Sequence, residues 1–135
     1  MTSTEARTRK PETYTHGLGE TIRAHRLYMG LSQRDMADRV GKDRRDYQRI
    51  ESGRDACPPG LLTQMETLSD AFSYQVDALI READRRGGLA LSIVADGSPG
   101  KEWERLVAGR AVVEASEDAP ITLVLVPVQK PAKVG

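Results

Sequence analysis

Glycines divide the first part of the sequence into three short pieces, and this spacing is the strongest constraint on the fold. Each piece carries apolar residues three or four positions apart, the repeat of an amphipathic helix, and ends at Gly30, Gly41 or Gly53. Ser32 and Asp43 begin the second and third pieces, and both residue types cap helix N-termini well. The pattern predicts one longer helix followed by two helices of about two turns each.

Helical spacing continues after a turn rich in proline and glycine at residues 58–60. Between residues 61 and 80 the apolar side chains recur at three- and four-residue intervals and form one stripe. The segment predicts one long helix, or two helices with a break near residues 69–73. The pair Gly87-Gly88 then ends the helical region.

Two strands and one helix are predicted after that glycine pair. Residues 89–95 and 121–126 are short apolar runs with β-branched side chains, and residues 101–115 between them return to helical spacing. The chain is therefore predicted to have an α+β fold, with an N-terminal four- to five-helix bundle and a small C-terminal β-α-β unit.

Composition and pattern divide the chain into four parts. The helical domain covers residues 17–86 and the β-α-β unit covers residues 87–128, with a loose tail at residues 129–135. Residues 1–16 are polar, have no apolar period and predict a flexible arm. The arm contains three basic residues that could follow a DNA groove, Arg7, Arg9 and Lys10. The alternative is a solvated tail without a role, which is the more common case for loose basic segments.

Charge and composition narrow the class of protein. The formal net charge is +0, which argues against a protein that coats nucleic acid indiscriminately. No apolar run approaches the roughly 18 residues that cross a bilayer, and no secretion signal opens the chain, so a cytoplasmic protein is expected. The single cysteine, Cys57, cannot form an internal disulfide, which suits a reducing compartment.

Two short helices joined by a tight glycine turn, with supporting helices before and after, are the layout of helix-turn-helix proteins. The second helix of such a pair docks on the bundle through a few apolar residues and presents a polar face to base edges. Residues 44–52 fit, because only Tyr47 and Ile50 are apolar and they lie three positions apart. We expect this helix to enter the major groove of DNA.

The sequence resembles the Cro and lambda-repressor-like family over about residues 17 to 80. The resemblance rests on Gly30-Leu-Ser-Gln-Arg-Asp-Met-Ala37, on Val40-Gly41, and on Ile50-Glu-Ser-Gly53 with Pro58 five residues further on. It implies four connected helices and binding to double-stranded DNA. It also implies roles for individual residues, position by position.

Base contacts are implied for three arginines of the second short helix, Arg44, Arg45 and Arg49. An arginine there can donate two parallel hydrogen bonds to O6 and N7 of guanine, so G·C pairs are expected in the site. Phosphate contacts, which add affinity without sequence choice, are implied for four further residues: Gln33, Lys42, Gln48 and Arg54.

Arg26 and Glu51 match a family pair that forms a partly buried salt bridge between the first helix and the recognition helix. The sequence also departs from the family. Tyr47 stands where a smaller aliphatic residue is usual, and Lys42-Asp43 replaces a more usual Val-Ser. Asp46 on the recognition helix either repels phosphate or accepts a hydrogen bond from a cytosine amino group.

A narrower resemblance, to the YdiL and anti-CRISPR-associated repressor group, rests on Glu51-Ser-Gly-Arg-Asp-Ala-Cys-Pro58, on Trp103-Glu-Arg-Leu106 and on the strand before it. It implies a phage or bacterial repressor with a small α/β dimerisation domain. A unit of about 45 residues with an apolar strand also invites pairing. The expected homodimer interface consists of apolar residues of the β-α-β unit: Leu91, Ile93, Trp103, Val107, Ile121, Leu123 and Leu125.

The leading hypothesis is a homodimeric transcriptional repressor that regulates its own operon and reads an inverted repeat. The alternatives are an antitoxin or other interaction protein whose C-terminal domain binds a toxin-like partner, and a regulator that also binds RNA. No enzyme is expected, because Cys57 lacks a paired base. No metal or cofactor is expected either, because His16 and His25 lack the spacing of metal ligands.

Overall fold

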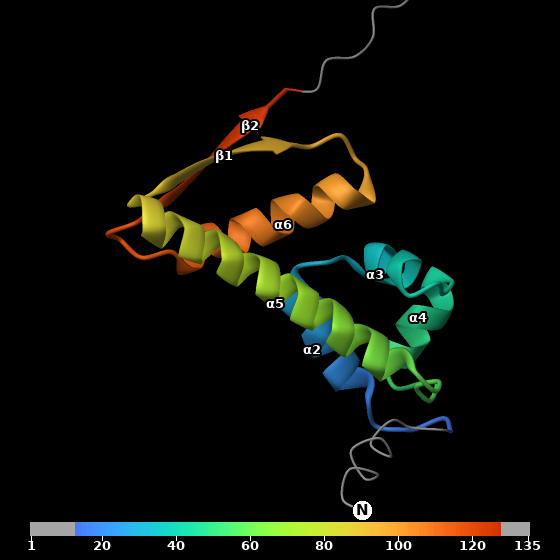
Figure 1. Ribbon diagram of the computed structural model, residues 1–135. Helices are drawn as coiled ribbons and strands as arrows, with labels where there is room; N and C mark the ends of the chain where they lie inside the picture. The colour runs from blue at the N-terminus through green and yellow to red at the C-terminus, as the bar shows by residue number, and fades with distance from the viewer. Residues whose placement is uncertain (1–12, 128–135) are drawn as a thin grey trace, which may run out of the picture. The chain divides into compact units, whose positions relative to one another are not determined.

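The computed structural model describes residues 13–127, and these residues form five helices and two strands (Figure 1). The predicted α+β class is confirmed. Most of the predicted arm and the predicted tail lie outside the described residues, Arg7, Arg9 and Lys10 included. In chain order the elements are α2 (Gly19–Met29), α3 (Gln33–Arg39), α4 (Arg44–Glu51), α5 (Leu61–Arg86), β1 (Leu89–Val94), α6 (Pro99–Glu114) and β2 (Ile121–Val126).

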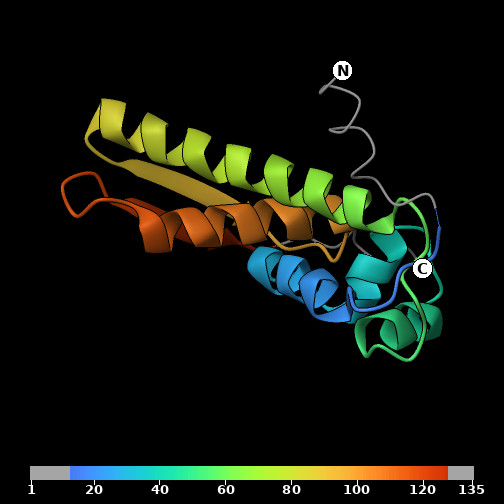
Figure 2. The same cartoon turned by 90° about the horizontal axis from the view of Figure 1, so that it is seen from below.

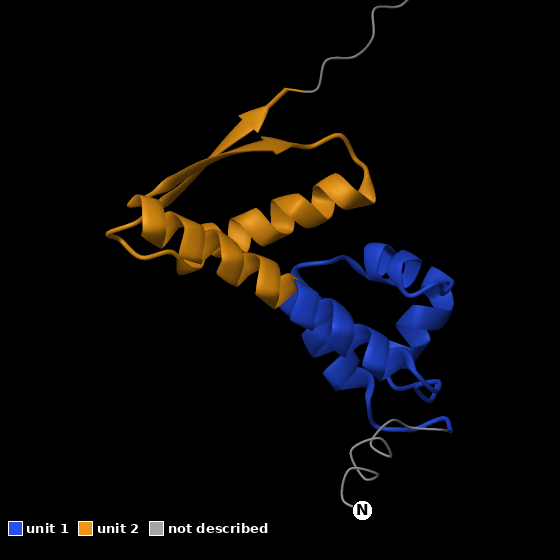
Figure 3. Cartoon of the chain, in the orientation of Figure 1, with its two compact units in different colours: residues 1–71 blue, residues 72–135 orange. Residues whose placement is uncertain are grey.

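The chain forms two compact units, residues 1–71 and 72–135, which Figure 3 shows in different colours. The boundary between them falls inside α5. That helix is one continuous element of 26 residues, so of the two predicted alternatives the single long helix is the one found. The sequence placed the domain boundary after the helix, because an apolar stripe does not reveal where one core ends and the next begins.

Caps fix the ends of the two short helices. The side chain of Ser32 accepts a hydrogen bond from the Asp35 amide at 3.0 Å, and that of Asp43 accepts one from the Arg45 amide at 3.0 Å. Gly41, in the turn between the helices, has a φ of 71°, a conformation that glycine adopts without strain. The predicted start of each short helix is therefore confirmed, and so is the turn between them.

The core of the first unit is built from one face of each helix. In α2, Leu27 is 47% exposed, whereas Met29 is buried. The reason is helical geometry, since Met29 lies seven positions after the buried Ile22 and shares its face, whereas Leu27 points away. The largest fully buried side chains of this unit are Ile22, Met29, Met36, Tyr47, Leu61 and Met65.

The second unit contains the predicted β-α-β arrangement. β1 and β2 pair in parallel, in a register that runs from Leu89↔Ile121 to Val94↔Val126. α6 connects the two strands and lies along them (Figure 2), as a parallel pair requires. Ile93 and Ile121, which share one face of the sheet, are buried.

Candidate nucleic-acid interface

α4 has one buried face and one exposed face. Tyr47, Ile50 and Glu51 are at most 5% exposed, and their spacing of three and four positions places them together on the docking face. Arg44 and Arg45, on the first turn, are exposed. α4 therefore has the two faces that a recognition helix needs.

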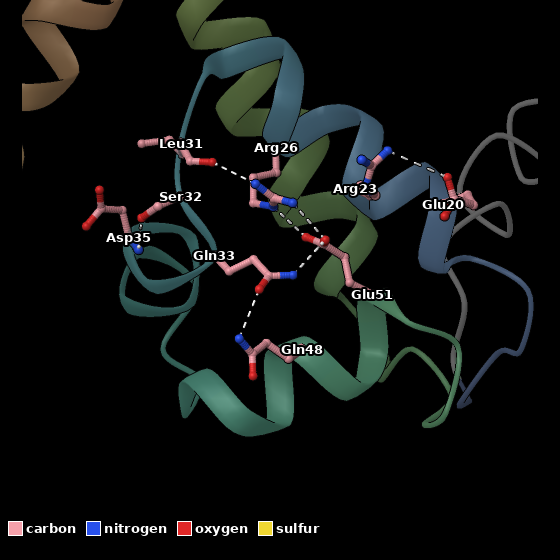
Figure 4. Close-up of polar contacts among 9 residues, drawn as sticks. All are labelled: Glu20, Arg23, Arg26, Leu31, Ser32, Gln33, Asp35, Gln48 and Glu51. Carbon is pink, nitrogen blue, oxygen red and sulfur yellow. Dashed lines mark hydrogen bonds and ion pairs between the residues drawn. The ribbon is translucent and has the colours of Figure 1, made fainter.

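A buried ion pair fixes α4 to α2, as Figure 4 shows. Arg26 donates from Nε to Glu51 Oε2 at 2.6 Å and from Nη2 to Glu51 Oε1 at 2.9 Å. Its Nη1 donates to the carbonyl of Leu31 at 3.0 Å. The two side chains are only 11% and 3% exposed, and a bidentate contact of this kind is among the stronger and more directional ones. The two residues expected to form the scaffold pair thus lie in this contact.

The charge state of the pair follows from its surroundings. Burial disfavours the ionised form of Glu51, but hydrogen bonds from Arg26 and Gln33 outweigh it and hold the pKa of Glu51 below its ordinary value. The hydrogen bond to Glu51 in turn raises the pKa of Arg26. Both groups are therefore charged at neutral pH.

Tyr47 brings a polar atom into the same core. Its side chain is fully buried, and its hydroxyl has no hydrogen-bond partner among the described residues. Burial raises the pKa of this hydroxyl, and the neighbouring Glu51 carboxylate raises it further. The ring fills the space where a smaller aliphatic residue was expected, and the hydroxyl is left unsatisfied.

Gln33 and Gln48, both expected to contact phosphate, lie in one hydrogen-bonded chain with Glu51 (Figure 4). Gln33 Nε2 donates to Glu51 Oε1 at 3.1 Å, and Gln48 Nε2 donates to Gln33 Oε1 at 2.9 Å. The chain links the start of α3 to α4 and so stabilises the angle between them. Each amide nitrogen keeps a second N–H group, which can donate a hydrogen bond to a phosphate oxygen.

The other basic residues expected at the interface lie on and beside α4. Arg54, in the loop after α4, is exposed like the two arginines of the first turn. Lys42, Arg49 and Arg54 line one hollow of about 510 Å³ next to the helix. Arg49 is ion-paired with Asp46 and Asp55. The structure thus brings three of the predicted DNA-contacting side chains to a common opening.

Gly19 is a residue of this scaffold that the sequence did not reveal. A Cβ atom on it would lie 2.5 Å from the Glu51 carbonyl oxygen and 2.9 Å from that of Ile50. The first turn of α2 therefore touches the last turn of α4 through the backbone, which only glycine permits. Nothing in the local pattern distinguishes Gly19 from an ordinary turn residue, because the contact is with a segment 30 positions away.

Three of the seven apolar residues expected at a dimer interface belong to the core of the second unit. Ile93, Val107 and Ile121 are buried. Trp103 is partly buried and donates to Gln75 Oε1 at 2.9 Å. Leu91 and Leu123 are also partly buried, whereas Leu125 is 60% exposed.

Cys57 and His25 are residues of the first unit that were weighed for nucleophilic catalysis and metal binding. Cys57 is buried, which raises the pKa of its thiol, and His25 Nδ1 lies 2.6 Å from Ser69 Oγ. Residues 13–127 contain no cluster of three or more side chains that could hold a metal ion. No helix in this part of the chain is long and apolar enough to cross a membrane.

Two short helices joined by a tight turn, the second docked by one face and basic on the other, define a helix-turn-helix domain. Residues 17–71 match the family model of a helix-turn-helix domain, which covers the part of the chain that contains α2, α3 and α4. The match is consistent with the resemblance to Cro and lambda repressor, and the narrower resemblance stays a prediction. Comparisons with curated proteins and with solved structures gave no match.

Proposed function

We propose that the chain is a sequence-specific DNA-binding regulator whose helix α4 enters the major groove. One observation carries this proposal: Arg44 and Arg45 are exposed on a helix whose opposite face is fixed by Tyr47, Ile50 and the Glu51 ion pair. A rigid helix can hold guanidinium groups at base edges, where each forms two hydrogen bonds to guanine. The matched helix-turn-helix domain supports the same conclusion.

Selection of bound duplexes from a random pool tests this proposal. The full chain is expected to enrich an inverted repeat, with G·C pairs in half-sites about 34 Å apart along the duplex. The same selection from a random RNA pool is the matched comparison. Enrichment of RNA alone would contradict the proposal, and so would the absence of enrichment in the DNA pool.

We propose further that two copies associate through the second unit. β2 is apolar except at Thr122, yet Val124, Leu125 and Val126 are 53%, 60% and 38% exposed. Parallel strands are usually covered on both faces, and a pair of strands alone leaves two unpaired edges. A second copy offers the same apolar surface and covers it symmetrically. The proposed interface is therefore the face of Val124 and Val126 together with Leu125, in place of the residues that form the unit's own core.

Sedimentation velocity with two matched variants tests the dimer. Val124→Lys places a charge in the proposed interface and is expected to give a monomer with weaker DNA binding. Val113→Lys, on α6, is the control, because Val113 is 81% exposed and lies outside the proposed surface. A dimeric Val124→Lys protein would place the interface elsewhere.

A dimer that reads an inverted repeat fits a repressor that blocks transcription from its own promoter. A reporter gene behind the selected duplex is expected to be silenced when the chain is expressed, and to stay active with Arg45→Ala. Unchanged expression would contradict repression. The exposed apolar strand also suits a protein partner, so co-purification of a toxin-like protein in place of a second copy would favour the antitoxin alternative.

A further inference from the structure

Two carboxylates hold the side chain of Arg49. Its Nε donates to Asp55 Oδ2 at 2.9 Å, and its Nη2 donates to Asp46 Oδ1. Asp46 lies one turn earlier on α4, and Asp55 lies in the loop after α4. The side chain of Arg49 is 37% exposed, that of Asp46 56% and that of Asp55 46%. The cluster is therefore open to a macromolecule that approaches α4.

The loop that carries Asp55 is itself anchored. The Asp55 amide donates to the Arg49 carbonyl at 3.0 Å, and the Ser52 hydroxyl donates to the same carbonyl at 3.1 Å. Two residues after Asp55, Cys57 and Thr15 exchange backbone hydrogen bonds of 2.8 and 2.9 Å. The carboxylate of Asp55 therefore stands on a fixed segment and can orient the group that it binds.

The two contacts leave the guanidinium with donors to spare. Arginine has five N–H groups, of which Asp55 and Asp46 take one each. Nη1 keeps both of its hydrogens and Nη2 keeps one, so each terminal nitrogen can still donate. Those are the two donors that O6 and N7 of a guanine require.

We propose that Asp46 and Asp55 are positioning residues that orient Arg49 toward one base and so set the sequence specificity of α4. The inference rests on the proposed DNA binding. A free arginine loses rotamer freedom when it binds, and the two carboxylates remove that freedom before DNA arrives. They also line the hollow next to Lys42 and Arg54, where a carboxylate repels phosphate from any duplex. Together the two carboxylates improve discrimination between base pairs and weaken binding to duplex DNA of any sequence.

The test compares affinities of full-length variants for two duplexes at one salt concentration. One duplex is the site selected by the unmodified chain, and the other has the G·C pair that depends on Arg49 changed to A·T. Asp55→Ala and Asp46→Ala are each expected to lower the ratio of the two affinities about fivefold, the smaller end of the discrimination of one arginine–guanine pair. Affinity for the altered duplex should stay equal or rise.

Two further variants make the result specific. Asp55→Asn keeps an oxygen that accepts from Nε and is expected to keep a ratio near that of the unmodified chain. Asp38→Ala removes an exposed carboxylate of α3 that forms no hydrogen bond or ion pair within residues 13–127, and should leave the ratio unchanged. Circular dichroism verifies that each variant is folded.

Several outcomes would overturn the inference. One is an unchanged ratio in Asp55→Ala and Asp46→Ala. Another is an equal loss in Asp38→Ala, which would indicate a general charge effect. A third is an unchanged preference for this G·C pair in Arg49→Ala. In that case DNA binding by α4 would stand, but Asp46 and Asp55 would not act through Arg49. Failure of the unmodified chain to bind any duplex would instead refute the proposed function.

Discussion

At the scale of single residues, Glu51 is the point where the contacts of the first unit converge. Its carboxylate accepts hydrogen bonds from Arg26 on α2 and Gln33 on α3, and its backbone lies against Gly19. The resemblance to the Cro and lambda-repressor-like family predicted the pair of Glu51 and Arg26 from the sequence. It did not show Gln33 in the same network, because a glutamine carries no charge that marks it as a partner.

Glu51→Ala is expected to lower the free energy of unfolding by about 3 to 5 kcal/mol, because it leaves the guanidinium of Arg26 buried without its partner. Urea denaturation measures this loss. Glu20→Ala is the control, since Glu20 and Arg23 form an exposed pair at 4.0 Å that should contribute less than about 1 kcal/mol. Similar losses in the two variants would contradict a structural role for the buried pair.

The stability should also depend on the ionisation of Glu51. Its pKa in the folded chain lies below the ordinary value, so its contribution is complete above the unfolded pKa of about 4.3 and is lost as the pH falls through the folded pKa. Urea midpoints between pH 7 and pH 3 should therefore fall less steeply for Glu51→Gln than for the unmodified chain. Parallel curves would show that other groups control the acid transition.

Tyr47→Phe removes the unsatisfied hydroxyl and keeps the ring that fills the core. The variant is expected to gain about 1 kcal/mol in the free energy of unfolding, since a buried polar group without a partner is costly. Thermal or urea denaturation measures the change. A clear loss of stability would mean that the hydroxyl is hydrogen-bonded to the Arg26–Glu51 pair.

At the scale of elements, local chemistry predicted the short helices well. Ser32 and Asp43 cap the helices that they were expected to begin, and the strand predicted at residues 121–126 is found there. The features that were not predicted depend on distant segments. The clearest example is the close approach of Gly19 to α4. The continuity of α5 through residues 69–73 was one of two alternatives that the sequence left open.

Gly19→Ala tests this close approach. The added methyl group would overlap the carbonyl oxygens of Ile50 and Glu51, which are backbone atoms and cannot rotate away. A loss of about 1 to 3 kcal/mol in the free energy of unfolding is expected. Gly109→Ala in α6 meets open space and should raise stability by roughly 0.5 to 1 kcal/mol, so a loss in both variants would contradict the argument.

At the scale of the whole molecule, α5 connects a unit that carries the helix-turn-helix domain with a unit that exposes an apolar strand. The change in apolar period near residue 88 predicts where the strands of the second unit begin, but not the boundary between the units, which lies within α5. The surface proposed for pairing could not be predicted, because residues 123–126 are apolar on both faces of the strand and the sequence does not show which face α6 covers. The residues first expected at the interface were the most apolar ones, and several of these form the core.

The most direct test of the central claim is a double-mutant cycle between α4 and its DNA site. Arg45→Ala is combined with a change of each G·C pair of the selected half-site in turn, and the affinities of all four combinations are measured. A coupling of about 1 to 3 kcal/mol is expected at one base pair, while Arg34→Ala on α3 shows none. If every base change cost the same with and without Arg45, in a variant with native circular dichroism, α4 would not read bases through this arginine.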